Sequence, residues 1–147
     1  MSDLNNFKDQ LLYEIQKAFY DERGKGARYR LTLAGVPYIK SQLGEKANDI
    51  DELKKWLVEK KFLEDIEIWQ DEIEFRAKMK KCCLYNICNS FIDRGTQPLS
   101  CPIANMFMSA IESELGLSPE LLPVELDGGN CGIRCAKIAD SAVVEAK

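Results

Sequence analysis

Histidine is absent from this chain of 147 residues. The absence removes the commonest general base, every Ser-His or Cys-His nucleophile pair, and every zinc site that contains histidine. An excess of basic charge is also lacking, because 24 acidic residues outnumber 20 basic ones. Non-specific binding to nucleic acid depends on basic side chains that neutralise phosphates. We therefore expect no nucleic acid as a partner.

Long apolar runs are missing as well. No stretch approaches the roughly 18 consecutive apolar residues that a membrane-spanning helix needs, and the opening MSDLNNFKDQLLYEIQKAF lacks the basic and apolar segments of a secretory signal. We therefore expect a cytoplasmic protein without a membrane span. In a reducing compartment its six cysteines indicate buried thiols, a metal site or a reactive nucleophile rather than a disulfide framework.

The spacing of apolar residues predicts helices in the N-terminal part of the chain. Helical periodicity runs over residues 3–22. Pro37 and Gly44 are placed as the start and the stop of a short helix, and a third helix begins near residues 49–51. The segment Gly24-Lys-Gly26 ends the first helix, and residues 28–33 then alternate in a way that fits either a short strand or the first turns of a second helix.

From residue 62 the period changes from helical to two, which predicts β-structure. Residues 62–81 read as an antiparallel hairpin with one apolar face. Residues 121–126 and 131–138 read as a second hairpin around a glycine-containing turn. Between the hairpins, residues 82–93 fit a helix, and a longer helix is predicted from Pro102 to the stop at Gly116.

These elements predict a single α+β domain over residues 1–147, in which an antiparallel sheet of two hairpins packs against several helices. We divide it into N-terminal helices (1–61), a cysteine-rich sheet-and-helix part (62–138) and a frayed tail (139–147). The N-terminal helix carries a long apolar stripe on a small domain. Because two-fold dimers are the commonest closed assembly, we expect a homodimer.

The six cysteines all lie in the second half of the chain, at or near the ends of predicted elements. Burial as small hydrophobic residues is the simplest interpretation of such thiols. A metal or cluster site is a more specific interpretation, although no short Cys-x2-Cys pair supports it. A catalytic nucleophile is the third, and Cys101 is its best candidate, because a thiolate at a helix N-terminus is stabilised by the helix dipole.

The predicted geometry selects a ligand set for a metal site. Cys131 and Cys135 fall on the same side of one strand with Cα atoms about 13 Å apart, too far to bind one ion. Cys82 is expected to point away from Cys83. The predicted metal ligands are therefore Cys83, Cys88, Cys101 and Cys131. Zinc is the first expectation, and an iron–sulfur cluster is the alternative, because both accept four thiolates.

Four segments then follow one another in a recognisable order. They are DIDELKKWLVEKK, FLEDIEIWQDEIEFRAKMK, CPIANMFMSAIESELG and VELDGGNCGIRCAKI. This order of a charged helix, a hairpin ending in cysteines, a cysteine-initiated helix and a final hairpin resembles the 4-vinyl reductase domain family of small-molecule-binding modules. The thiazoline-carboxylate hydrolase-like proteins are a related alternative. The resemblance covers roughly residues 48–138.

The resemblance implies an antiparallel sheet backed by helices, a pocket for a small or hydrophobic ligand, and frequent dimerisation. It matches Cys82 or Cys83, Cys101 and Cys131 with cysteines of the family that would converge on one site, and some members bind a metal there. One departure concerns the pocket, because residues 102–110 contain no glycine where the family often has a glycine-rich stretch.

Three functions follow as alternatives. The first is a cytoplasmic, sensor-like module that binds a small molecule or a metal at a cysteine-lined site. The second is a cysteine-dependent, hydrolase-like enzyme, whose base would have to be an acid, a lysine or another thiolate. The third is an interaction protein with buried structural thiols.

Overall fold

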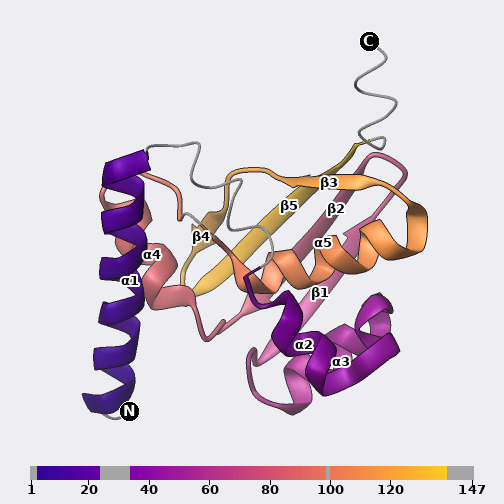
Figure 1. The fold of residues 1–147 in the computed structure, drawn as a ribbon, viewed down its shortest axis with the longest axis horizontal. Helices are drawn as coiled ribbons and strands as arrows, with labels where there is room; N and C mark the ends of the chain where they lie inside the picture. The colour runs from indigo at the N-terminus through magenta and orange to yellow at the C-terminus, as the bar shows by residue number, and fades with distance from the viewer. Residues whose placement is uncertain (1–2, 24–33, 99, 139–147) are drawn as a thin grey trace.

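A computed structural model describes residues 3–23, 34–98 and 100–138. It forms one α+β domain in which helices cover one face of an antiparallel sheet (Figure 1). The helices are α1 (Asp3–Arg23), α2 (Val36–Leu43), a 3₁₀ helix (Gly44–Asn48), α3 (Ile50–Glu59), α4 (Tyr85–Asp93) and α5 (Pro102–Leu115). The strands are β1 (Asp65–Gln70), β2 (Glu74–Lys80), β3 (Ser118–Leu121), β4 (Glu125–Asp127) and β5 (Asn130–Ile138).

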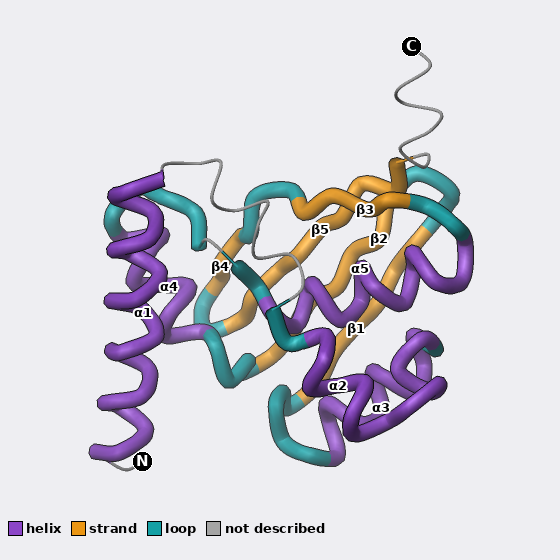
Figure 2. The backbone as a smooth tube through the Cα atoms, viewed as in Figure 1, coloured by secondary structure: helices purple, strands orange, loops and turns teal. Residues whose placement is uncertain are grey.

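The sheet joins the two predicted hairpins through the pairing of β2 with β5. The strand order is β1-β2-β5-β3, and β4 pairs with β5 on the same side as β3. Helix α5 lies across the sheet with α2 and α3 beside it, whereas α1 and α4 lie side by side at one end (Figures 1 and 2). The predicted α+β class and both hairpins are therefore confirmed.

The strand predicted over residues 121–126 is in fact split into β3 and β4. Leu121 pairs with Cys135, and Glu125 pairs with Gly132. Glu125 lies four residues after Leu121, whereas their partners on β5 are three residues apart, so the chain between β3 and β4 contains one extra residue. The extra residue falls around Pro123, which has no N–H to donate to the ladder. The expectations for residues 24–33 and for the tail 139–147 fall outside the described residues.

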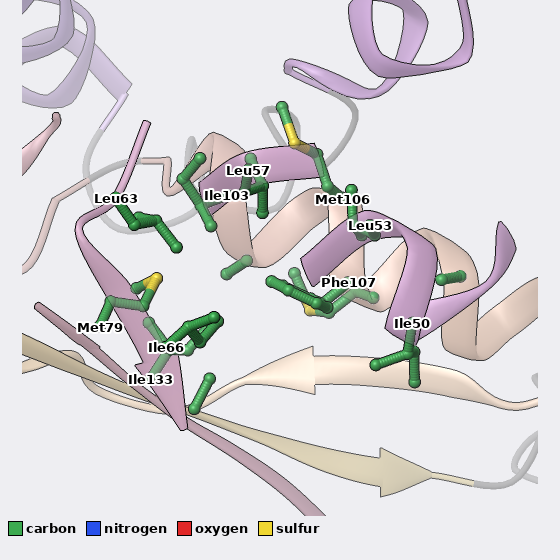
Figure 3. Packing of buried hydrophobic residues seen from close by; sticks show 14 of the residues in the cluster. Ile50, Leu53, Leu57, Leu63, Ile66, Met79, Ile103, Met106, Phe107 and Ile133 are labelled. Carbon is green, nitrogen blue, oxygen red and sulfur yellow. The ribbon is translucent and has the colours of Figure 1, made fainter. Parts of the chain in front are cut away.

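The hydrophobic core lies between the sheet and helices α3 and α5 (Figure 3). The inward face of β2 contributes Phe75, Ala77 and Met79, all buried, as the predicted alternation requires. Phe75 meets Phe107 of α5 with ring centroids 5.3 Å apart. This contact ties the helix layer to the sheet.

Gly35 sets the distance between α2 and α5 at the point where both helices begin. Its φ is +90°, a conformation that favours glycine. A Cβ atom at this position would lie 2.9 Å from Cβ of Pro102. Buried Asn105 fixes the same junction, because its Nδ2 donates to the Ala34 carbonyl oxygen at 3.1 Å and to Ser100 Oγ at 3.2 Å.

Asp71 organises the turn of the first hairpin. Its Oδ1 accepts hydrogen bonds from the backbone N–H groups of Ile73 and Glu74, both at 2.8 Å, and these bonds lower the pKa of the carboxyl group. We expect Asp71→Ala to lower the thermal midpoint by about 2–4 °C at pH 7, whereas Glu72→Ala in the same turn leaves it unchanged.

The pH dependence of this effect has a defined sign. Because the folded-state pKa of Asp71 is depressed, its stabilisation is present above the ordinary aspartate pKa of about 3.9 and is lost as the pH falls through the folded-state value. The difference between wild type and Asp71→Ala should therefore shrink in acid. Equal midpoints at pH 7, measured by circular dichroism, would contradict the role of this carboxylate.

Candidate functional site

The six cysteines all lie in the described residues and are thiols, not disulfides. Cys82 and Cys83 follow β2, Cys88 lies on α4, Cys101 caps α5, and Cys131 and Cys135 lie on β5. Cys82, Cys88, Cys131 and Cys135 are buried, Cys101 is half-buried and Cys83 is exposed.

Four of these thiols line one pocket. Cys82, Cys88, Cys101 and Cys131 come from four separate parts of the fold, which meet at the end of the sheet nearest α1 and α4. The pocket has a volume of about 80 Å³. The other residues of its wall are mainly apolar: Leu12, Gln16, Leu84, Tyr85, Ile87, Pro98, Ser100 and Pro102.

The sulfur atoms of Cys82 and Cys101 accept hydrogen bonds from backbone N–H groups. Leu84 N–H donates to Cys82 Sγ, and Ala104 N–H donates to Cys101 Sγ, each over 3.4 Å. The second bond is the N-terminal cap of α5, so Cys101 Sγ also lies at the positive end of that helix dipole. Such N–H groups stabilise negative charge on sulfur and are typical partners of thiolate ligands.

Pairs of thiols interact across the site. A hydrogen bond to Cys83 and burial raise the pKa of the Cys82 thiol well above its usual range, and the same bond lowers the pKa of Cys83. A hydrogen bond to Cys88 and burial likewise raise the pKa of Cys131. Negative charge on Cys101 opposes ionisation of both Cys82 and Cys131. The pocket thiols are therefore close enough for each to affect the ionisation of others.

Cys135 is separate from this pocket. It is completely buried on the core face of β5 and pairs in register with Phe75. Burial raises the pKa of Cys135 to about 12. Its place on the same face as Cys131, but outside the pocket, agrees with the expectation that only one of these two cysteines joins the site.

Three of the four predicted ligands, Cys88, Cys101 and Cys131, line the pocket, and Cys83 does not. Cys82 takes that place. The choice of Cys83 over Cys82 thus differs from the structure, in which Cys82 is buried in the pocket wall and Cys83 is exposed outside it. Lys81, with φ of +52°, interrupts the extended backbone just before the pair, so strand alternation no longer sets the side-chain directions.

The thiols do not form a closed metal site as they stand. Over residues 3–23, 34–98 and 100–138, no group of three or more Cys, Asp or Glu side chains is arranged to hold an ion. The donor chemistry nevertheless fits a thiophilic metal, because four thiols share one pocket. A bound ion would require the side chains to rotate from these positions.

No sequence pattern indicated that α1 contributes to the pocket. Leu12 and Gln16 lie one helical turn apart and reach the pocket wall. Gln16 is an ordinary polar residue in an amphipathic helix, and only the position of α1 against the cysteine-bearing segments identifies it as part of the site.

Cys83 is expected to be the fastest of the six thiols to react with iodoacetamide. It is exposed, and its hydrogen bond from Cys82 lowers its pKa, which increases the thiolate fraction at neutral pH. Mass spectrometry of briefly treated protein should find one label on Cys83. Cys83→Ser should remove this fast phase and buried Cys88→Ser should keep it, whereas a first label on Cys101 would instead favour the nucleophile hypothesis.

Comparison with known proteins gave no match to a family model, a curated protein or a solved structure. The resemblance to the 4-vinyl reductase domain family thus rests on element order and cysteine positions, and stays a prediction. Within the described residues, each helix is too short or too polar to span a membrane.

Proposed function

We propose that this protein is a metal-binding, sensor-like module, with its metal held by thiolates drawn from Cys82, Cys88, Cys101 and Cys131. The observation that carries the proposal is the convergence of these four thiols, from four elements, on one pocket. Four separate segments have no reason to place cysteine at one point if each thiol serves only as a small apolar side chain.

The size of the pocket favours a metal over a hydrophobic ligand. Pockets for drug-sized ligands have volumes of roughly 300–1,000 Å³, and an engineered apolar cavity that binds benzene has a volume of about 150 Å³. The thiol pocket has only about 80 Å³. It suits an ion, or a group of a few atoms, better than an extended hydrophobic molecule.

The ionisation of the thiols also supports a cation. Hydrogen bonds to Cys83 and Cys88, burial and repulsion from nearby thiolates raise the pKa of Cys82 and Cys131, so both stay protonated while the pocket lacks positive charge. A divalent cation would supply that charge and displace the protons. Zinc is the first choice and an iron–sulfur cluster the alternative, since cysteine thiolates bind both. Such reduced thiols suit a cytoplasmic location.

Anaerobic purification followed by metal analysis and an absorption spectrum tests this proposal. One zinc per chain in colourless protein is the expected result, and iron and sulfide with broad visible absorption would indicate the cluster. Apo-protein should bind added zinc with release of protons, so its affinity should rise with pH. If the protein contains no metal and binds neither zinc nor iron, the proposal is contradicted and the thiols have structural roles only.

A homodimer formed through α1 remains a further prediction. Leu4, Phe7 and Ile15 of this helix are 58%, 62% and 57% exposed, and Leu11 lies on the same stripe. Light scattering should give twice the chain mass of 16.7 kDa. Phe7→Ser combined with Ile15→Ser should give monomers, whereas Trp69→Ser, at an exposed sheet position, should not. Wild-type protein that stays monomeric at high concentration would contradict the prediction.

A further inference from the structure

Helix α1 contacts the rest of the domain through the more polar of its two faces. Tyr13 packs against Phe91 of α4 with ring centroids 4.9 Å apart, and Arg94 Nη1 donates to Tyr13 Oη at 3.2 Å. The apolar stripe of α1, which includes Phe7 and Ile15, is turned away and exposed. Hydrophobic burial alone would favour the opposite orientation. Hydrophobic burial therefore does not explain why the polar face of α1 points toward the domain.

Gln16 occupies this inward face at the wall of the thiol pocket. Its Oε1 atom is buried, and within the described residues it accepts no hydrogen bond. A buried carbonyl oxygen without a donor is destabilising, and most such atoms in folded proteins have a partner. The orphaned acceptor therefore indicates that a donor is supplied by something other than these residues.

We propose that Gln16 recognises the occupant of the thiol pocket, by accepting on Oε1 a hydrogen bond from a donor that this occupant carries. This inference rests on the proposed metal site. A water molecule on the metal is the simplest donor of this class, because a bound cation makes water a stronger donor. The metal then keeps one position for a non-protein ligand on the α1 side, and its sulfur ligands are drawn from the four thiols.

Substitution of Gln16 by methionine tests the recognition directly. Gln16→Met has a similar shape without the carbonyl, so the metal-free protein should be as stable as wild type or more stable. Zinc affinity, measured by competition with a chromophoric chelator, should fall roughly 10-fold to 100-fold, as on loss of other hydrogen-bond partners near a metal. Gln16→Glu keeps an acceptor oxygen and should retain at least wild-type affinity.

Gln10→Met is the matched control, because Gln10 is exposed on the same helix and should not affect zinc affinity. If Gln16→Met binds zinc with wild-type affinity, the proposed role of Gln16 is contradicted, whereas the proposed metal site is not. A Gln16→Met protein that loses stability without metal would show that Gln16 only holds α1 in place, which also overturns the inference. Failure of wild type to bind metal would instead overturn the proposed function.

A second experiment tests whether the metal keeps one coordination position for a non-protein ligand. In protein loaded with cobalt(II), added azide should change the visible absorption spectrum, because azide replaces the non-protein ligand. An unchanged spectrum would indicate a closed shell of four sulfur ligands and would overturn the inference, even if zinc binds tightly.

Discussion

Replacing Cys101 with serine is expected to weaken zinc binding by more than 100-fold while preserving the metal-free fold. Serine is a good N-cap residue, so its hydroxyl oxygen can take over the hydrogen bond that Cys101 Sγ accepts from Ala104 N–H. Helix α5 therefore keeps its start, but the thiolate is lost. Removal of a ligand should exceed the roughly 10–100-fold effect of removing a ligand's hydrogen-bond partner.

The stability measured with zinc should fall together with the affinity. Metal that binds only the folded state contributes its binding free energy to folding, so zinc should raise the thermal midpoint of wild type and have little effect on Cys101→Ser. Calorimetric titration and thermal unfolding provide the two readouts. Unchanged metal content in this variant would remove Cys101 from the ligand set.

Cys82 and Cys83 offer a matched comparison, because they are neighbours and only Cys82 lines the pocket. Cys82→Ser should lose zinc affinity, and Cys83→Ser should retain it. The opposite outcome would support the ligand set predicted from the sequence and would mean that the segment after β2 rearranges when metal binds.

Truncating Phe107 to alanine is expected to destabilise the fold by about 3–5 kcal/mol. Phe107 is fully buried on α5 and packs against Phe75 of β2 across the boundary between helices and sheet. Proteins of this kind are stable by only about 5–15 kcal/mol, so the loss is a large fraction of the total. Equilibrium urea unfolding at fixed protein concentration measures it.

Ile73→Ala is the control for this truncation, because Ile73 is 74% exposed in the turn region of the first hairpin. Its expected effect is within about 0.5 kcal/mol. A loss below about 1 kcal/mol for Phe107→Ala would mean that the interface between α5 and the sheet collapses into the vacated space, and that the ring contact does not anchor the layers.

Most of the fold could be predicted from local patterns. Helical spacing over residues 3–22 and the Pro102 start of α5 correspond to α1 and α5 within one residue. The change to a period of two marked the first hairpin, whose buried face is Phe75, Ala77 and Met79. These patterns are reliable because each segment must present one apolar face to a core, and the period of that face differs between helix and strand.

The cysteine site was only partly predictable. Proximity to element ends correctly brought Cys88, Cys101 and Cys131 together in one pocket. The choice between Cys82 and Cys83 depended on the backbone at Lys81, whose positive φ breaks the alternation that sequence reasoning assumed. The spacing of apolar residues does not reveal the conformation of a single residue. The residue type gave no indication either, because lysine is not among the residues enriched at positive φ.

The sequence by itself determined which segments are helices and strands. It also showed that cysteine thiols are the main candidate functional groups of a chain without histidine. Tertiary structure alone decided which thiols share a pocket, how small that pocket is, and that α1 turns Gln16 toward it with its apolar stripe outward. The physical reason is that local patterns record which face of an element is apolar. The elements that meet at a point are set by the packing of the whole domain.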